Sequence, residues 1–399
     1  MQKFSRRVPR DLAANRLAQA VEALRREGRA FIDLTESNPT RAAFYYPDDL
    51  LRPLADVRAL RYNPSPFGAA EARRAVASEY ERRGLAVDPD RIVLTASTSE
   101  AYSLLFKLLA DAGDEVLVPR PSYPLFDHLT RLDLVEARPY DLEYHGVWTV
   151  DFAGLERRIS SRTRAVLVVS PNNPTGSFVG REDMQRLTAL CAGRHAAVIA
   201  DEVFADYEVE PGASARAGSA LSGSAALVFA LGGLSKSVGL PQVKLGWIAI
   251  GGPDALAREA LDKLELICDT YLSTSTPVQV AAAELLQRGG AIRSQIAARI
   301  VDNYVRLTAL VAAVPSCRVL RTEGGWYAVI QVPSIQPEED LVLTLLTRDA
   351  VLTHPGYFFD FPRESYLVVS LLTPEAAFSE GIARIVRHFD CTTLLEPHA

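Results

Sequence analysis

The sequence predicts an α/β protein: a three-layer αβα large domain with a mostly parallel sheet, plus a smaller α+β domain. From about residue 90, short apolar segments alternate with amphipathic segments of helical periodicity. Most apolar segments are continuous, without alternating polar residues, which is typical of strands buried on both faces of a parallel sheet. After Arg318 the pattern changes to short strands between helices, which indicates a second, smaller unit.

The N-terminal segment precedes this regular pattern and has its own elements. Residues 11–27 are expected to form a helix, because Asp11 can cap its start and Gly28 follows its end. Residues 30–34 are predicted to be a short strand, and residues 37–40 form a Ser-Asn-Pro-Thr turn. We expect this segment to join the C-terminal part of the chain.

The regular region supplies the large domain. Its predicted strands are 91–95, 115–119, 165–170, 197–201, 226–231 and 245–250. The predicted helices are 98–111, 181–193, 254–268, 278–288 and 291–313, followed by strands at 317–321, 326–332 and 366–371. We place the domain change near residue 286. Residues 45–285 would then form the large, cofactor-binding domain, and residues 1–44 and 286–399 the small one.

Composition excludes several classes of protein. The net charge is −6 with both signs interspersed, so neither nucleic acid nor a membrane is expected as the main partner. No apolar run is long enough to span a membrane, and the Arg-rich N-terminus has no apolar segment typical of a secretory signal. The cysteines, at 191, 268, 317 and 391, are too far apart for a zinc site or a disulfide framework. We therefore expect no metal and a cytoplasmic location.

Lysine is rare in this chain. It occurs only at positions 3, 107, 236, 244 and 263, while arginine supplies the other basic side chains. Lys236 and Lys244 share a glycine-rich segment that follows the apolar run 226–231. An amine can form an imine with an aldehyde, whereas a guanidinium cannot, because it stays protonated and delocalised. Lys236 is therefore a candidate for covalent chemistry, although taken alone it could equally be a surface lysine in a loop.

Polar groups follow the predicted strands where each strand ends. Ser97, Thr98 and Ser99 open a helix after 91–95, and a helix N-terminus with hydroxyls can bind phosphate. A capping box between Ser97 and Glu100 explains the same residues. The remaining ends carry Asn173 in a Pro-Asn-Asn-Pro-Thr-Gly turn, Asp201, and Lys236. Ligands of open α/β sheets bind beyond such carboxyl ends, so these groups are expected to converge.

Pyridoxal phosphate would use all of these groups. A lysine holds its aldehyde, a carboxylate pairs with its ring nitrogen, and a helix terminus holds its phosphate. The carboxylate matters because a protonated ring accepts the electrons released from the substrate's Cα. Asp201 follows a strongly apolar strand, where burial is expensive unless a partner compensates. Asp201 could also be only a helix cap.

With these motifs in this order, the chain resembles the aspartate aminotransferase family, the class I/II fold-type I pyridoxal-phosphate enzymes. The motifs are the helix at Ser97, the Asn-Pro-Thr-Gly turn, the Asp-Glu-x-aromatic strand end at Asp201, and Ser-Lys followed by Gly-Leu-Pro at Lys236. The resemblance covers nearly the whole chain. It implies the pyridoxal-phosphate-dependent transferase fold and a homodimer with active sites at the interface.

The resemblance also implies roles for individual residues. Lys236 would form the Schiff base with the cofactor and shuttle the proton, Asp201 would pair with the pyridine nitrogen, and Asn173 would hydrogen-bond the ring hydroxyl. Tyr123 would stack on the ring, and Tyr62 would reach the neighbouring subunit's phosphate. The full set of implied cofactor contacts is Ser97, Thr98, Ser99, Tyr123, Asn173, Asp201, Phe204, Ser235, Lys244 and Tyr62.

Some positions depart from the family's pattern. Lys244 stands where an arginine usually binds the phosphate, and Gly233 stands where a serine or threonine is usual. Phe204 replaces a tyrosine, so a hydroxyl contact to the ring oxygen is missing unless Tyr207 supplies it. Most seriously, Val368 replaces the arginine that clamps the substrate's α-carboxylate. Either another arginine serves, with Arg41 and Arg363 as candidates beside Asn173, or the substrate lacks a conventional α-carboxylate. Each of these arginines is by itself more typical of solvated surface charge.

These residues favour an aminotransferase that exchanges an amino group between an amine or amino acid donor and a keto acceptor. A pyridoxal-phosphate-dependent lyase, such as a C–S lyase on the same fold, is the main alternative, because of Val368 and Phe204. A non-catalytic ligand sensor would need an output domain, for which the 44 residues before the large domain are too few. A cofactor-free lysine aldolase would leave Asp201 and the helix at Ser97 without a role.

Overall fold

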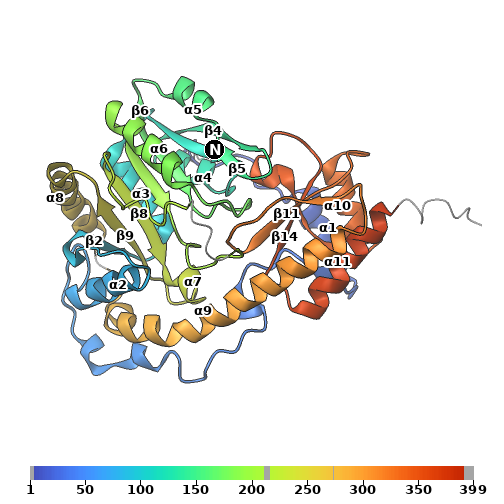
Figure 1. Ribbon diagram of the computed structural model, residues 1–399. Coiled ribbons are helices and arrows are strands. Elements are labelled where there is room, and N and C mark those ends of the chain that lie inside the picture. Colours follow the sequence, from blue (N-terminus) through green and yellow to red (C-terminus); the bar gives the residue numbers. More distant parts are fainter. Residues whose placement is uncertain (1–3, 211–215, 273, 391–399) are drawn as a thin grey trace, which may run out of the picture.

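The computed structural model describes residues 4–210, 216–272 and 274–390, so Lys3 and Cys391 lie outside the described residues. Its centre is an eight-stranded sheet in the order β2-β9-β8-β7-β6-β3-β4-β5 (Figure 1). The strands are β2 Ile92–Thr95, β3 Glu115–Arg120, β4 Glu136–Tyr144, β5 Trp148–Val150, β6 Thr163–Val169, β7 Ala197–Asp201, β8 Val228–Gly233 and β9 Gly246–Gly251. All run the same way except β9 and β5, which confirms the mostly parallel sheet.

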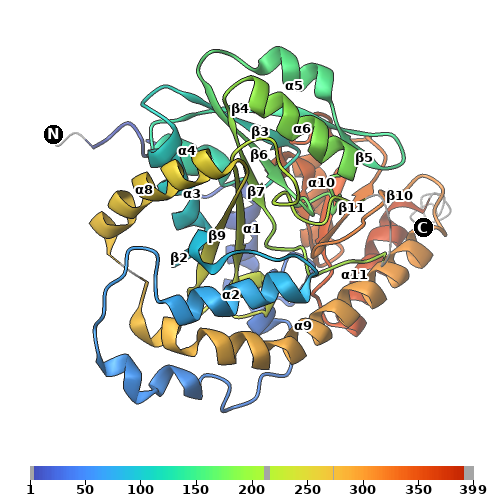
Figure 2. The same cartoon turned by 60° about the vertical axis from the view of Figure 1, so that its left-hand side comes forward.

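Helices cover both faces of this sheet, which gives the predicted three layers (Figure 2). One face packs against α3 Thr98–Leu109, α4 Phe126–Leu132 and α8 Asp254–Tyr271. The other packs against α2 Ala70–Arg82, α5 Phe152–Arg158, α6 Arg181–Gly193 and α9 Thr276–Val311. The strand side chains are buried on both faces, as the continuous apolar runs predicted.

A second, antiparallel sheet forms the smaller unit. Its order is β10-β11-β14-β13, with strands β10 Arg318–Val319, β11 Tyr327–Gln331, β14 Tyr366–Ser370 and β13 His354–Pro355. Beside it, β1 Ile32–Asp33 pairs in parallel with β12 Val351–Leu352, so the N-terminal segment joins the C-terminal part of the chain. The accompanying helices are α1 Arg16–Arg26, α10 Glu338–Thr347 and α11 Glu375–Phe389.

The long helix α9 runs beneath both sheets in Figure 1 and packs along α2 in Figure 2. The prediction of two helices, at 278–288 and 291–313, is wrong, because one helix continues through Gly289 and Gly290. A Cβ atom on Gly289 would lie 2.5 Å from the Cβ of Val238, so glycine lets α9 approach that segment closely. The division at residue 286 falls inside α9 and stays a prediction.

Other predicted boundaries need correction. Helix α1 begins at Arg16, where the Asn15 side chain accepts the N–H of Ala18, so Asp11 is not its cap. A capping side chain accepts the N–H two or three residues after it, and Asn15 meets that spacing whereas Asp11 does not reach the first turn. No helix in residues 4–210, 216–272 and 274–390 is long and apolar enough to cross a membrane. The same residues contain no group of three or more His, Cys, Asp or Glu suited to a metal ion.

Candidate active site

The polar groups singled out in the sequence lie at one edge of the large sheet. Strands β2, β6, β7 and β8 run the same way, so their carboxyl ends share this edge. Ser97 begins α3 just after β2, and Asn173 lies in the turn after β6. Asp201 ends β7, and Lys236 lies in α7 Leu234–Ser237 directly after β8. The sheet therefore places these groups along one edge, with β9 between the ends of β2 and β8.

Lys236 lies against aromatic rings. Its Nζ is 4.7 Å from the ring centroid of Trp326 and 5.5 Å from that of Phe204. Burial lowers the pKa of Lys236 from 10.5 to about 8, while the nearby Asp201 carboxylate opposes this shift. A lysine with such a pKa has a substantial neutral fraction near neutral pH, and only the neutral amine can attack a carbonyl carbon.

The backbone around Lys236 is held by side-chain donors. The bonds run from Tyr207 Oη to the Lys236 carbonyl (2.6 Å), from Arg293 Nε to the Ser237 carbonyl (2.8 Å), and from Tyr46 Oη to the Gly239 carbonyl (2.8 Å). Because Tyr207 donates its proton to this turn, it does not replace the hydroxyl that is missing at Phe204. The sequence alternative in which Tyr207 contacts a cofactor is therefore not supported. Its ring instead packs edge-on against Trp326.

Asp201 is 9% exposed and accepts two hydrogen bonds. Tyr102 Oη donates to Oδ2 (2.8 Å), and the Val203 N–H donates to Oδ1 (3.1 Å). Burial raises the pKa of Asp201 from 3.8 to about 6, and these two bonds and Lys236 oppose the rise. Burial of an ionised carboxylate costs free energy, and a hydrogen bond from a cationic N–H would offset part of that cost. The contact of Tyr102 with Asp201 was not predicted from the sequence, because Tyr102 reads there as an ordinary core residue of α3.

Asn173 and Tyr123 lie beyond the neighbouring strands β6 and β3. Asn173 is 8% exposed, and its Oδ1 has no hydrogen-bond partner within the described residues. A buried acceptor of this kind is costly unless a ligand supplies a donor. The Tyr123 ring is 40% exposed, and burial and the nearby Asp201 raise the pKa of its hydroxyl. These features fit a ligand with a hydroxyl group and a flat face.

The start of α3 is a suitable phosphate site. Ser97 Oγ accepts the Glu100 N–H (3.1 Å), so the cap is present, although the Glu100 carboxylate accepts the N–H of Ala96 and not that of Ser97. Within the described residues, the N–H groups of Thr98 and Ser99 and their hydroxyls have no partner. The Ser97 hydroxyl proton is also free to donate. Several donors at one helix terminus suit a phosphate group.

Comparisons with known proteins agree with this geometry. The profile of the family described as aminotransferase class I and II matches residues 34–385. The chain belongs to this family. Glutamate-pyruvate aminotransferase AlaA of Haemophilus influenzae is 26% identical over 92% of this chain and 93% of its own length. Human tyrosine aminotransferase is 28% identical over 83% of this chain and 74% of its own.

Solved structures show the same fold. An aminotransferase from Escherichia coli matches with a TM-score of 0.84 and 23% identity, covering 98% of this chain and 99% of that one. A Thermus thermophilus aspartate aminotransferase variant matches with a TM-score of 0.83 and 24% identity, over 97% and 100% of the two chains. The fold-type I fold is thus confirmed. This class I/II aminotransferase is a pyridoxal-phosphate-dependent enzyme.

Some predicted residues of this aminotransferase lie outside the cluster. Lys244 is exposed and has a left-handed backbone with φ +63°, although it is near Gly246, which packs on the Ser97 backbone. Tyr62 is 67% exposed, and Ser235 is half-buried. Neither side chain makes a hydrogen bond within the described part of one chain. Their assigned contacts stay predictions.

The small sheet forms the opposite wall. Val368 on β14 is fully buried and lies beside Val329 on β11 and His354 on β13. Cross-strand neighbours share a face, and on this face Tyr327 contacts the ring of Phe359 (6.3 Å). The Phe359 carbonyl accepts the N–H of Ser122, next to Tyr123. Burial lowers the pKa of His354 to about 4, so His354 is neutral. No charged side chain stands beside Val368 on either neighbouring strand.

The two candidate arginines differ in their surroundings. Arg41, in the 3-10 helix Pro39–Arg41, pairs with Glu36 (3.1 Å). Burial raises the pKa of Tyr327 to about 12, and Tyr123 and Glu36 add smaller contributions in the same direction. The nearby Ser37 side chain opposes this rise. Arg363 is exposed just before β14 and has no ion pair within the described residues. Both arginines are exposed, and Arg363 acts electrostatically on Tyr366, two residues before Val368 on β14.

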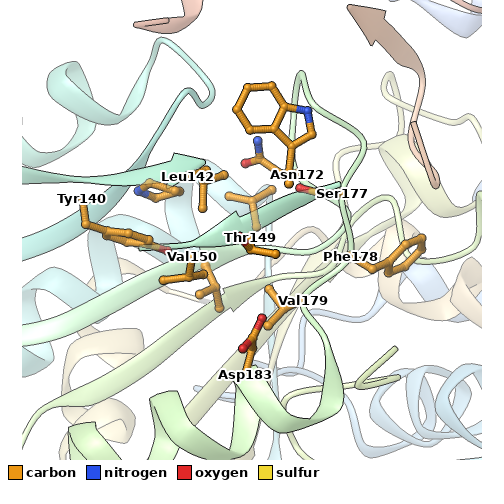
Figure 3. Close-up of a pocket in the computed structure, with 13 residues that line it drawn as sticks. Tyr140, Leu142, Thr149, Val150, Asn172, Ser177, Phe178, Val179 and Asp183 are labelled. Atoms are coloured by element: carbon orange, nitrogen blue, oxygen red, sulfur yellow. The ribbon is translucent and has the colours of Figure 1, made fainter. Parts of the chain in front are cut away.

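A small cavity of about 20 Å³ is lined in part by Asn172 and Ser177, which follow β6 (Figure 3). It is lined by side chains of β4, β5 and β6 and by Asn172, Ser177 and Asp183, but not by Lys236 or Asp201. Asn172 Nδ2 donates to the Pro121 carbonyl (3.1 Å) and to Thr175 Oγ1 (2.9 Å). The cavity has room for roughly one water molecule. The hydrogen bonds of Asn172 beside it hold the turn in place.

Proposed function

We propose that this enzyme moves an amino group from an amine or amino-acid donor to a keto acceptor, with Lys236 as the lysine that bonds to pyridoxal phosphate. The observation that carries the assignment is that a low-pKa lysine and a buried carboxylate follow the adjacent strands β8 and β7 at one sheet edge. Burial lowers the pKa of Lys236 to about 8. Perturbed pKa values of this kind cluster at functional sites.

Residues of this chain would hold the cofactor along its whole length. The free N–H groups at Thr98 and Ser99 suit its phosphate, Asp201 its ring nitrogen, and the orphan oxygen of Asn173 its ring hydroxyl. When bound, pyridoxal phosphate supplies an aldehyde for amines and a protonated ring that accepts electrons. Tyr123 presents an exposed ring face for stacking.

Lys236 is suited to act as both nucleophile and base. Its neutral fraction gives Nζ a free lone pair, and the rings of Trp326 and Phe204 shield it from bulk water. Once the donor's nitrogen has displaced it, Nζ is free to take a proton from the donor's Cα and to return one later. The bonded carbonyls of Lys236 and Ser237 fix the turn, so Nζ moves without its backbone.

The substrate assignment follows from the small-sheet wall. The relatives are named for alanine, glutamate, pyruvate and tyrosine, so α-amino acids are the first donors to test. With a buried valine at 368, we propose that Arg41 takes a substrate carboxylate by leaving Glu36. The Tyr327–Phe359 wall would then contact an apolar or aromatic side chain.

We also propose that the active enzyme is a homodimer. Tyr62 and its neighbours Val57 and Leu60 expose most of their surface, as do Leu266 and Leu272 at the end of α8. Exposed apolar groups on this scale favour an interface with another protein surface. Tyr62 would reach the partner's phosphate site. Gel filtration with light scattering tests this, and a monomeric, fully active enzyme would refute it.

A cytoplasmic location remains our proposal. Cys191, Cys268 and Cys317 are buried free thiols, which suit a reducing compartment. Cys391 lies outside the described residues. Fractionation of the native host, followed by immunodetection, checks the location.

One experiment separates transamination from elimination. The holoenzyme is incubated with each donor and no acceptor, and the products are quantified. Stoichiometric pyridoxamine phosphate and the donor's keto acid support the aminotransferase. Ammonia and keto acid formed over many turnovers would support the lyase alternative. Val368 and Phe204, the departures from the family's pattern, are the reason to test it. Amines without a carboxylate belong in the same screen. If the enzyme prefers such amines to amino acids as donors, the proposed role of Arg41 is wrong.

A further inference from the structure

Tyr102 is the one side chain that donates to Asp201 within the described residues. It is 2% exposed and lies in the second turn of α3. Its ring is fixed edge-on against Phe126 (5.5 Å) and lies stacked near Phe106 (6.1 Å). Rings packed on two sides cannot swing away, so the hydroxyl stays 2.8 Å from Oδ2.

The two bonds on Asp201 are divided between its oxygens. Tyr102 binds Oδ2 from α3, and the Val203 N–H binds Oδ1 from the backbone beyond β7. A carboxylate with one donor on each oxygen has a fixed plane and keeps lone pairs for another N–H. Without Tyr102, only the Val203 bond would restrain it, and the carboxylate could rotate about that bond.

Helix α3 also carries the proposed phosphate site at its first residues. Ser99 and Tyr102 are three residues apart, which is about 4.5 Å along a helix axis. One rigid helix thus sets the spacing between the phosphate end and the carboxylate that faces the ring nitrogen. The same helix packs against β2 and β9 within the apolar core of this face.

We propose that Tyr102 is a positioning residue that fixes the Asp201 carboxylate in the orientation needed to bind the ring nitrogen of pyridoxal phosphate. This rests on the proposed cofactor site. The charged and titratable groups that face Asp201 are Tyr102 from α3, Glu202 next in the chain, Lys236 from α7 and Tyr123 from the loop after β3. Of these, Tyr102 is the one with a side-chain hydrogen bond to the carboxylate.

The test compares Tyr102→Phe with a matched control. Tyr140→Phe also removes a buried tyrosine hydroxyl, which donates to the Leu167 carbonyl on the same sheet (2.9 Å). Both changes keep the ring, so both variants should fold, and circular dichroism and melting curves check this. The Asp201 carboxyl is titrated in the apoprotein by ¹³C NMR with labelled aspartate, assigned through Asp201→Asn.

We expect the Asp201 titration of Tyr102→Phe to move to higher pH, because a bond that stabilises the ionised form is lost. Affinity for pyridoxal phosphate, measured by equilibrium dialysis, should fall at least about tenfold, since bonds to charged groups are the stronger ones. Tyr140→Phe should match the parent in both measurements. In an Asp201→Asn background, Tyr102→Phe should change affinity by less than about twofold.

An unchanged Asp201 titration in folded Tyr102→Phe, with affinity within twofold of the parent, would overturn the inference. The same loss in Tyr140→Phe would also overturn it, because any buried hydroxyl would then do the same. Failure of the parent protein to bind pyridoxal phosphate would instead refute the proposed cofactor site. The apoprotein titration would still show whether Tyr102 governs Asp201.

Discussion

The two walls of this active site are built differently. On the large-sheet wall, Lys236, Asp201 and Asn173 follow neighbouring strands. Burial lowers the pKa of Lys236 and raises that of Asp201, and Asn173 Oδ1 has no hydrogen-bond partner within the described residues. The small-sheet wall is neutral, with a fully buried Val368 beside Val329. The contrast teaches that the chemistry common to the family is fixed by the large sheet. Recognition of a particular substrate depends on the other wall, where this chain departs from the pattern.

The contrast is sharpest at Lys236, where we expect the largest effect. Lys236→Ala removes the amine that bonds to the cofactor, so the visible absorption band should be lost completely after mixing with pyridoxal phosphate and dialysis. Lys263→Ala is the control, because that side chain is exposed and, among the described residues, pairs with Glu259 alone (2.6 Å). A Lys236→Ala protein that keeps the band would show that another lysine is responsible.

Asp201→Asn should come next in size. Loss of the carboxylate removes its stabilisation of a protonated ring, and kcat should fall by roughly 10²–10³. Steady-state kinetics with saturating cofactor measures this. A kcat within threefold of the parent would mean that Asp201 does not face the ring nitrogen.

The same variant should make the apoprotein more stable at pH 7.5. The pKa of Asp201 is raised in the folded state from 3.8 to about 6, so its favourable contribution is present at low pH and is lost as the pH rises through about 6. At pH 7.5 this corresponds to roughly 3 kcal/mol against folding, as an upper bound. Urea midpoints of parent and variant should therefore differ at pH 7.5 and converge near pH 4.

Cofactor uptake should follow the protonation of Lys236. Its pKa is lowered to about 8, and only the neutral amine reacts, so the rate constant for formation of the absorption band should fall about tenfold per pH unit below 8. Above pH 8 the rate should level off. Stopped-flow mixing of apoprotein with pyridoxal phosphate measures it. A rate that is independent of pH between 6 and 8 would contradict the assigned state of Lys236.

On the substrate wall, Arg41 and Arg363 can be tested against each other. Arg41→Ala should raise KM for carboxylate substrates by roughly tenfold, the loss of one moderately strong ionic contact. Arg363, which is also exposed and acts on Tyr366 of β14, is the comparison: Arg363→Ala should change KM by less than about twofold if Arg41 takes the carboxylate. If neither variant changes KM, the small-sheet wall does not recognise a carboxylate through these residues.

The sequence predicted the large-sheet wall better than the small-sheet wall for a physical reason. A polar residue directly after an apolar parallel strand lies at the carboxyl edge of the sheet. Asp201 and Asn173 could therefore be placed there from the neighbouring sequence alone. Tyr102 could not, because its role depends on a contact 99 residues away in the chain. Tyr207 was ambiguous because the direction of a hydroxyl depends on packing against Trp326 and the Lys236 turn.

Helix α9, which joins the two walls, allows the smallest and most local test. The sequence prediction ended one helix at 288 and began the next at 291. A close approach explains only Gly289, whose added Cβ would lie 2.5 Å from that of Val238. Nothing lies within 4 Å of a Cβ on Gly290. Gly290→Ala should therefore stabilise the protein by about 0.5–1 kcal/mol, because alanine favours a helix and glycine does not.

Gly289→Ala should do the opposite. Overpacking should destabilise the protein by about 1–3 kcal/mol, and displacement of Val238, two residues after Lys236, should slow the uptake of pyridoxal phosphate. Urea unfolding of both apoproteins and the stopped-flow assay measure the pair. Equal stabilisation by both alanines would mean that α9 does not press on the Lys236 segment. The large-sheet wall would then hold its lysine without help from the helix that reaches the small sheet.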